Sequence, residues 1–318
     1  MAQPATYETQ HTITVAAAAE VVFGLIENVG DWPVIFPPTV HAEQIERTGD
    51  TERIRIWATA NGEVKGWTSR RELDRRGLRV RFRQEASRPP VSAMGGEWAI
   101  EPLPEGGSLV RLSHDFRAVD DDPASAEWIR QAVDRNSDRE LAALRDAAEQ
   151  RERRADLLLT FSDEVRVTGA VKDVYDFLDR ADLWPRRLPH VARTELTADA
   201  AGEQILEMDT RTPDGSTHTT KSVRICFPYD RIVYKQQLTP ALMTAHTGEW
   251  TVREDGRDTV VTSTHTVVVN AEAVPGVLGA DADAGVAEAR AFIRDALGRN
   301  STVTMMHAKE YAEGVARG

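Results

Sequence analysis

Apolar and polar residues alternate along this chain in a way that predicts two similar halves. In the first half, the alternating run from Tyr7 to Val15 predicts a strand, and the run from Ala18 to Val29, apolar on one face, predicts a short helix. Further alternating runs, separated by turn signals such as Asn61-Gly62, predict several antiparallel strands. An amphipathic helix from about Ala124 to Arg154 closes this half.

The second half repeats the same order of elements. A strand is expected from Glu164 to Val167, a helix from Val171 to Asp179, then several strands, and a long helix from about Asp283 to Glu313. This order is typical of an α+β fold, in which a curved antiparallel sheet buries the apolar stripe of the long C-terminal helix. A gap between such a sheet and its helix predicts an internal pocket.

Repeated motifs support a duplicated domain. Four landmarks occur in the same order in both halves, which is the signature of an internal repeat. The stretch from Gln150 to Asp156 is the expected linker, so we expect domains over residues 1–153 and 154–318. The landmarks are Trp32-Pro33 and Trp184-Pro185, Ser69-x-Arg71 and Ser222-x-Arg224, Gly96-Glu97-Trp98 and Gly248-Glu249-Trp250, and Arg135-Asn136-Ser137 and Arg299-Asn300-Ser301.

Composition narrows the possible functions. The 318 residues carry a formal net charge of -12, which disfavours nucleic-acid binding, and no apolar run is long enough to span a membrane. The single cysteine, Cys226, excludes a disulfide framework and a thiolate metal cluster. The first residues do not resemble a secretory signal, so a cytoplasmic location is expected. We find no metal-hydrolase, P-loop or dinucleotide motif and expect neither metal nor cofactor.

Strand alternation indicates which side chains face the pocket in the first half. From Trp67 to Leu73, one face carries Trp67, Ser69, Arg71 and Leu73, whereas the other is wholly polar. Arg71 is therefore expected on the inner face, where a charge is costly unless a partner is near. By the same reasoning His114 points inward from its strand, and helical spacing places Asn136 on the stripe that faces the sheet.

The second half leaves the orientation of its arginine open. Ser222 and Arg224 alternate with Val223 and Ile225, so the face away from the arginine is the more apolar one. Either that apolar face packs against the first domain, or the orientation is reversed and Arg224 is exposed. His265 corresponds to His114 and shares its face with valines, and Asn300 corresponds to Asn136.

Each candidate residue also has a purely structural interpretation. An arginine on a strand is usually a surface group, and the histidines are more often satisfied interior residues than bases. Single tryptophans are more often core than binding residues, and the asparagines can bind backbone or water. Besides Arg71, the stretch from Arg70 to Arg88 contains seven arginines, which form either a charged outer sheet face or a docking patch for an acidic partner.

The combined motifs resemble those of the aromatase/cyclases of bacterial type II polyketide synthases, and the duplication resembles their di-domain subclass. The likeness covers nearly the whole chain. It implies two tandem helix-grip (START or Bet v 1-like) domains, although this fold hosts many unrelated functions. The residues that carry it are Asp31-Trp32-Pro33, Phe36, Trp67-x-Ser69-x-Arg71, Trp98, His114-Asp115-Phe116 and Asn136-Ser137.

The resemblance implies a substrate and a reaction. The substrate would be a poly-β-ketone on an acyl carrier protein, delivered by other type II polyketide synthase components. The enzyme would close the first ring by an intramolecular aldol condensation and promote dehydration to an aromatic ring. Two departures stand out, since Thr39 occupies a position where monodomain relatives tend to carry tyrosine, and Thr220 replaces Trp67 in the second half.

Site residues follow from the resemblance and from the residue chemistry together. A permanently protonated arginine can stabilise a developing enolate or alkoxide, and a histidine can transfer the proton. We expect Arg71→Ala to abolish correct first-ring products and leave the fold intact. A non-catalytic carrier of hydrophobic ligands is the alternative. The expected catalytic residues are Arg71, Ser69, His114, Arg224 and Ser222, and the expected substrate-binding residues are Trp32, Trp67, Trp98, Asn136, Trp184, Trp250, His265 and Asn300.

Overall fold

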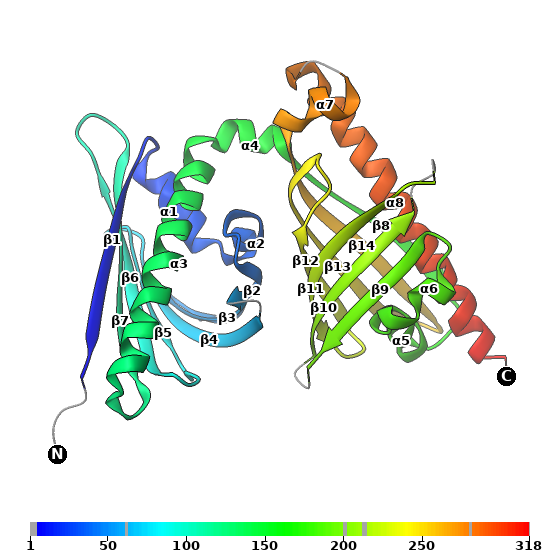
Figure 1. Ribbon diagram of the computed structural model, residues 1–318, viewed down its shortest axis with the longest axis horizontal. Coiled ribbons are helices and arrows are strands. Elements are labelled where there is room, and N and C mark those ends of the chain that lie inside the picture. Colours follow the sequence, from blue (N-terminus) through cyan, green and yellow to red (C-terminus); the bar gives the residue numbers. More distant parts are fainter. Residues whose placement is uncertain (1–4, 61–62, 200–201, 212–214, 280–281, 318) are drawn as a thin grey trace. The chain divides into compact units, whose positions relative to one another are not determined.

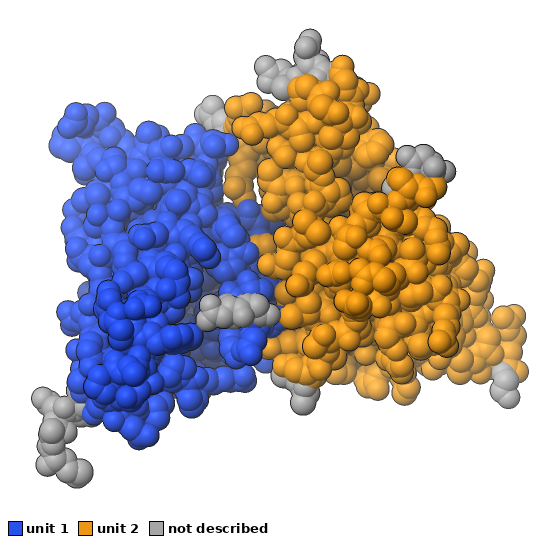
Figure 2. Space-filling view, in the orientation of Figure 1, with its two compact units in different colours: residues 1–152 blue, residues 153–318 orange. Residues whose placement is uncertain are grey.

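The structure of this chain is a computed structural model, which describes residues 5–60, 63–199, 202–211, 215–279 and 282–317. These residues divide into two compact units, residues 1–152 and 153–318 (Figure 2). Each unit contains one seven-stranded antiparallel sheet and one long helix near its C-terminal end (Figure 1). The predicted α+β architecture is therefore confirmed in both halves.

In the first unit the sheet has the strand order β1-β7-β6-β5-β4-β3-β2, so the first two strands of the chain form opposite edges. Two short helices make that crossing, and the long helix α3 lies against β1 and β7 on the concave side (Figure 1). The elements are β1 (Tyr7–Val15), α1 (Ala19–Glu27), α2 (Trp32–Ile35), β2 (Thr39–Thr48), β3 (Thr51–Ala60), β4 (Glu63–Asp74), β5 (Arg79–Gln84), β6 (Val91–Pro102), β7 (Ser108–Ala118) and α3 (Pro123–Glu149).

The second unit repeats this topology, with the order β8-β14-β13-β12-β11-β10-β9. Its long helix α8 packs on β8 and β14, as α3 does on β1 and β7. The elements are α4 (Arg151–Leu157), β8 (Leu158–Val167), α5 (Val171–Asp179), α6 (Trp184–Arg187), β9 (Val191–Ala198), β10 (Glu203–Arg211), β11 (Thr217–Phe227), β12 (Arg231–Leu238), β13 (Met243–Asp255), β14 (Asp258–Val269), α7 (Val274–Leu278) and α8 (Ala282–Val315).

Two segments of the structure differ from the sequence prediction, and a third prediction cannot be compared with it. The expected linker from Gln150 to Asp156 is largely the helix α4, because its charged residues are also good helix formers. The strand expected from Glu164 begins six residues earlier, at Leu158. The hairpin expected at Asn61-Gly62 lies outside the described residues.

The start of the long helix α3 is set by a capping residue and a proline. Asp122 caps its first turn by accepting a hydrogen bond from the backbone N–H of Ser125, and Pro123 occupies the first turn, where a missing N–H costs nothing. Its buried stripe runs through Ile129, Val133 and Ser137 toward the concave sheet. The spacing of three to four residues is that of one helix face.

Candidate functional site

Arg71 is the most deeply buried charged residue of the predicted site. Its residue is 1% exposed on the inner face of β4, next to Ser69, whereas Arg70 and Glu72 on the other face are exposed. The predicted orientation of this strand is therefore confirmed. Burial lowers the pKa of Arg71 to about 10, against the opposing effect of nearby glutamates, so its guanidinium stays protonated at neutral pH.

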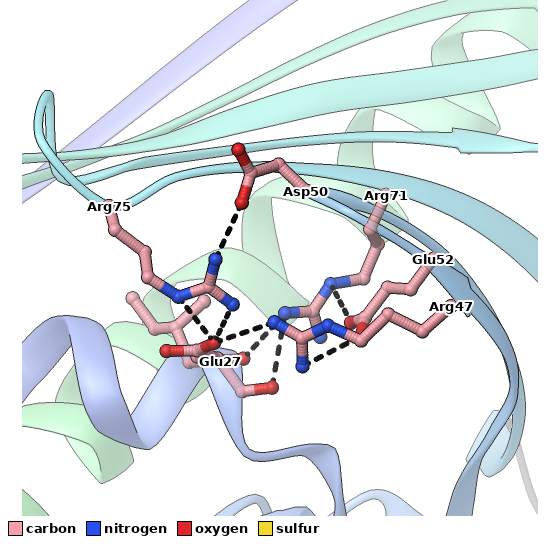
Figure 3. Close-up of polar contacts among 7 residues, drawn as sticks. Glu27, Arg47, Asp50, Glu52, Arg71 and Arg75 are labelled. Carbon is pink, nitrogen blue, oxygen red and sulfur yellow. Dashed lines mark hydrogen bonds and ion pairs between the residues drawn. The ribbon is translucent and has the colours of Figure 1, made fainter.

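Glu52 on β3 is the carboxylate that accompanies this buried cation. It pairs with Arg71 in the strand register, and its Oε1 lies 3.3 Å from Nε of Arg71 (Figure 3). Burial raises the pKa of Glu52, Arg71 opposes this, and Glu27 adds to it. Arg47 extends the cluster, reaching Glu27 at 3.2 Å and Glu52 at 3.8 Å. The charge of Arg71 is thus largely balanced inside the protein.

The guanidinium of Arg71 also caps the C-terminus of α1. Nη2 of Arg71 donates to the backbone oxygens of Ile26 at 3.1 Å and Glu27 at 3.3 Å, at the C-terminus of α1 (Figure 3). These carbonyls lack partners inside the helix and form the negative end of its dipole. Trp32 donates from Nε1 to Leu25 O, one residue earlier, and its ring centroid lies 5.3 Å from the guanidinium.

The second unit repeats this arrangement. Nη2 of Arg224 donates to Leu178 O at 2.7 Å and Nη1 donates to Asp179 O at 3.3 Å, at the C-terminus of α5. Trp184 donates to Phe177 O, and its ring lies 5.4 Å from the guanidinium of Arg224. The recurring Trp-Pro and Ser-x-Arg motifs therefore share a structural task, which is to bind the free carbonyls of the first helix.

This task changes one expectation from the sequence. Replacing Arg71 by alanine would leave Glu52 with only the more distant Arg47, at 3.8 Å, and would free two helix carbonyls, so we expect the fold to be less stable. The arginine therefore needs a stability control in any activity test. The alternative in which Arg224 is exposed is wrong, because that residue is 2% exposed, and Val223 and Ile225 on the opposite face are buried as well.

The two arginines differ in the charge that accompanies them. Gln204 stands opposite Arg224 in the strand register, where the first unit has Glu52 opposite Arg71. The amide of Gln204 donates to Asp179 Oδ1 at 3.0 Å. Arg224 forms no ion pair with any residue the structure describes. Its positive charge is consequently less neutralised than that of Arg71.

A cavity of about 120 Å³ in the second unit brings together all six residues predicted for that half. Arg224 and Ser222 are both among its lining residues, and the hydroxyl of Ser222 lies 3.5 Å from Leu206 O. Tryptophans and apolar side chains form much of the remaining wall. The lining includes Trp184, Leu206, Met208, Thr220, Ser222, Arg224, Tyr234, His246, Trp250, His265, Leu297, Asn300 and Thr304.

A hydrogen-bonded cluster of two histidines and a tyrosine lines the same cavity. Nδ1 of His265 lies 3.0 Å from Nε2 of His246 and 3.1 Å from the hydroxyl of Tyr234, and its Nε2 lies 3.2 Å from the hydroxyl of Ser263. Burial lowers the pKa of His265 to about 4 and lowers that of His246 well below its usual value. Burial raises the pKa of Tyr234. Both imidazoles are therefore neutral at physiological pH and the hydroxyl keeps its proton.

In the first unit the predicted residues are more dispersed. A cleft of about 620 Å³ is lined mainly by charged side chains of the face directed away from α3, together with Phe82 and His114. Ser69 and Arg71 are not among its lining residues. His114 contacts the Phe82 ring edge-on at 5.5 Å, and burial lowers its pKa to about 4. Its Nδ1 has no hydrogen-bond partner among the described residues.

The predicted tryptophans of the first unit belong to its core. Trp98 is 6% exposed and packs with Phe36, and Trp67 is half-buried beside a small cluster that includes Ile54 and Ile56. Trp32 is half-buried and packs on both groups. These positions provide apolar walls, and none of the three tryptophans lines the cleft of the first unit.

The orientation expected for Asn136 is wrong. Asn136 is exposed, whereas the next residue, Ser137, is buried on the sheet-facing stripe because it lies four residues after Val133. The hydroxyl of Ser137 has no hydrogen-bond partner among the described residues. In the second unit Asn300 is half-buried and reaches the cavity.

Ion pairs neutralise much of the arginine-rich run. Arg79 and Arg81 bind Glu97 at 2.9 and 2.8 Å, and Arg83 binds Asp115 at 2.6 Å. Arg75 binds Glu27 and Asp50 (Figure 3). The run thus fits a charged outer sheet face better than a strongly basic docking patch.

The family follows from comparison with known proteins. A family model described as "Polyketide cyclase / dehydrase and lipid transport" matches residues 6–149, and a second model of the same description matches residues 167–290. The chain belongs to this family. Neither unit has a described helix that is both long and apolar enough to cross a bilayer.

The similarity to known proteins extends over nearly the whole chain. It is 48% identical to the granaticin polyketide synthase bifunctional cyclase/dehydratase of Streptomyces violaceoruber, over 98% of this chain and 95% of that protein. It is 45% identical to the actinorhodin counterpart of Streptomyces coelicolor, over 97% and 98%. Among solved structures, the di-domain aromatase/cyclase BexL matches with a TM-score of 0.87 and 52% identity, over 96% of this chain and 99% of BexL. The di-domain StfQ matches with 0.86 and 37%, over 98% and 100%. The resemblance seen in the motifs is confirmed.

Three residues that the sequence analysis did not predict are partners of predicted site residues. Glu52 balances Arg71, and Tyr234 and His246 join His265 in one cluster. His246 lies four residues before Trp250 on one strand, so alternation alone places both on one face. Tyr234 reaches them only through strand pairing, which the sequence does not reveal.

Proposed function

We propose that this protein is a cofactor-independent polyketide aromatase/cyclase. It binds a poly-β-ketone carried by an acyl carrier protein of a type II polyketide synthase, closes the first ring by an intramolecular aldol reaction, and promotes loss of water toward an aromatic ring. Membership of the polyketide cyclase/dehydrase family and full-length similarity to two bifunctional cyclase/dehydratases support this proposal.

The observation that carries the proposal is the under-neutralised guanidinium of Arg224 in the second unit's cavity. Two of its five N–H groups bind helix carbonyls, which fixes its position, and the remaining donors are available to a substrate oxygen. A fixed cation beside a developing enolate or alkoxide stabilises the aldol transition state. A hydrophobic-ligand carrier has no need of such a cation, so this feature favours the enzyme.

The reaction also requires regioselectivity, because the chain contains many similar carbons, and the shape of the cavity can provide it. A methylene between two ketones is already acidic, and the difficulty lies in bringing one carbon to one carbonyl. Walls formed by Trp184 and Trp250 hold a folded chain so that the reacting atoms stay close together. The attacking carbon then forms the new bond, and the alkoxide produced beside Arg224 takes up a proton.

Adding the full-length protein to a reconstituted minimal polyketide synthase tests this function. We expect a changed ring pattern and more dehydrated product than the synthase yields alone. Asn300→Leu, which places a larger side chain in the cavity wall, should abolish this change. Thr302→Leu, on the exposed side of the same helix, is the matched control and should retain it. An unchanged product profile with the wild-type protein would support the carrier instead.

A further inference from the structure

The two units carry the same backbone frame around their inner histidines. Gly96 on β6 pairs with both Phe82 and His114, and Gly248 on β13 pairs with both Tyr234 and His265. In each unit a glycine Cβ would clash with the aromatic ring, at 2.7 Å from Phe82 Cζ and 2.2 Å from Tyr234 Cζ. The ring therefore occupies the same place in both units, and only the second has a hydroxyl there.

Besides the difference between Phe82 and Tyr234, the two units differ at a second position. His246 stands two residues before Gly248, at the place that Met94 holds relative to Gly96. Met94 lies beside Gln84, 3.8 Å from its amide nitrogen, and can neither give nor take a proton. The first unit thus places His114 against a phenyl ring, and His11 lies near enough to lower its pKa, but Nδ1 of each of these histidines has no hydrogen-bond partner among the described residues. The second unit instead builds a three-residue hydrogen-bonded cluster.

The cluster holds more hydrogen-bonding capacity than it can use internally. Nδ1 of His265 has either one lone pair or one proton, yet both Nε2 of His246 and the hydroxyl of Tyr234 lie within 3.1 Å of it. Only one of these two partners can be satisfied well at a time. In addition, the buried Nδ1 of His246 has no hydrogen-bond partner among the described residues. All three side chains line the cavity, so the cluster borders the space that a ligand would occupy.

We propose that Tyr234 and His246 act with His265 as a proton relay for the water-losing step, and that this step belongs to the second unit. The inference rests on the function proposed above. The residues shared by both units, arginine and tryptophan, hold the first helix and can steady a substrate oxygen. The residues found in one unit only serve the step that needs both a base and an acid.

The reaction balances without any further reagent. An imidazole of the cluster takes the proton from the carbon next to the ketone, and the C–H electron pair becomes an enolate beside Arg224. Those electrons form the new carbon–carbon double bond as the C–O bond to the hydroxyl breaks. The leaving oxygen takes the proton of Tyr234, departs as water, and Tyr234 recovers a proton from the imidazolium. The protein ends as it began.

The protonation states suit these roles. The imidazoles are neutral, and so able to accept a proton, because burial depresses the pKa of each. Tyr234 keeps its proton for donation. The charged residues that act on His265 are Asp163, which raises its pKa, and Arg294, which lowers it. These two bind each other at 2.6 Å and act on His265 in opposite directions, and desolvation is the largest of the three effects.

The first unit provides the substitutions for a test in the full-length protein. Tyr234→Phe reproduces Phe82, and His246→Met reproduces Met94, so each variant carries a side chain that this fold already accommodates. Tyr229→Phe is the control, because it removes a hydroxyl from an exposed side chain outside the cavity. Each protein is added to a reconstituted minimal polyketide synthase. Mass spectrometry then measures ring-closed products with and without the lost water, and circular dichroism verifies folding.

We expect ring closure to persist in both variants while water loss slows on the order of 100-fold, the usual contribution of a positioned acid or base. Tyr229→Phe should behave as wild type. Water loss at the wild-type rate in folded Tyr234→Phe and His246→Met proteins would overturn the relay, and so would an equal loss of ring closure. If the wild-type protein itself leaves the product profile unchanged, the proposed function fails first, and the two failures are thus distinguishable.

Discussion

Removing the guanidinium of Arg71 should destabilise the first unit far more than a typical surface substitution. In Arg71→Ala, Glu52, which is 3% exposed, loses its nearer cation and keeps only Arg47 at 3.8 Å, and the carbonyls of Ile26 and Glu27 lose the donor from Arg71. Breaking a buried pair by removing one partner costs about 3–5 kcal/mol. Domains are stable by only about 5–15 kcal/mol, so this is a large share of the total.

Two further variants isolate the cause. The double variant Arg71→Ala with Glu52→Gln replaces the stranded carboxylate by an amide, and should recover about 1–3 kcal/mol relative to Arg71→Ala alone. Arg224→Ala is the matched comparison in the second unit. The residue opposite it is the uncharged Gln204, so no buried carboxylate is stranded there and the cost should be smaller.

The sign of the pH dependence gives an independent check. In Arg71→Ala the folded-state pKa of Glu52 lies above its unfolded value of about 4.3, because burial acts without the opposing cation. Between these two values the folded state binds more protons than the unfolded state, so stability falls as pH rises. Destabilisation should therefore be greater at about pH 8 than at about pH 5, and the Glu52→Gln double variant should lack this trend.

Urea unfolding followed by tryptophan fluorescence measures these effects. Five of the chain's seven tryptophans lie in residues 1–152, so the signal reports mainly on the first unit. Hydrogen exchange of the α1 amides, residues 19–27, localises the loss. Equal costs for Arg71→Ala and Arg224→Ala, with no recovery from Glu52→Gln, would refute the role assigned to the buried pair.

Two other predictions concern packing and protonation. Gly248→Ala should cost about 1–3 kcal/mol by urea unfolding, because the added Cβ would lie 2.2 Å from Cζ of Tyr234, whereas Gly24→Ala meets nothing within 4 Å and should stabilise α1 by about 0.5–1 kcal/mol; similar costs would contradict this. His114 and His265 have folded pKa values of about 4, below an unfolded value of about 6.5. The unfolded chain therefore binds more protons between these values, and stability should fall as pH drops through this window, so a flat profile there would be inconsistent with buried neutral imidazoles.

Alternation along the strands predicted the inner faces because it depends only on neighbours in the sequence. It placed Arg71 and His265 inside correctly, and both are buried. Helical spacing failed for Asn136, because the positions three and four residues after Val133 both lie near the same helix face, and packing buries the fourth, Ser137. Alternation also left out Glu52 as a partner, since that requires knowing which strand lies beside which and in what register.

The comparison of the two units separates scaffold from chemistry. A motif that recurs in a duplicated domain is first evidence for what both copies need, and both copies need the carbonyls at the end of the first helix to be bound. Arg71 and Arg224 meet that need with the same geometry, so their recurrence alone does not indicate catalysis. The differences around them do bear on chemistry. The first unit folds with Glu52 and Phe82, so the fold itself does not require Gln204 and Tyr234 at the corresponding positions of the second unit.

In the second unit those changes act in one direction. Replacing a carboxylate by Gln204 leaves more positive charge in the cavity, and replacing a phenyl ring by Tyr234 adds a proton donor beside His265. A cation, a donor and neutral imidazoles are the groups that an enolate-forming elimination requires. A carrier would gain nothing from burying them together, since burial removes each of them from water. The desolvation cost of this arrangement is therefore itself an argument for chemistry in the second unit.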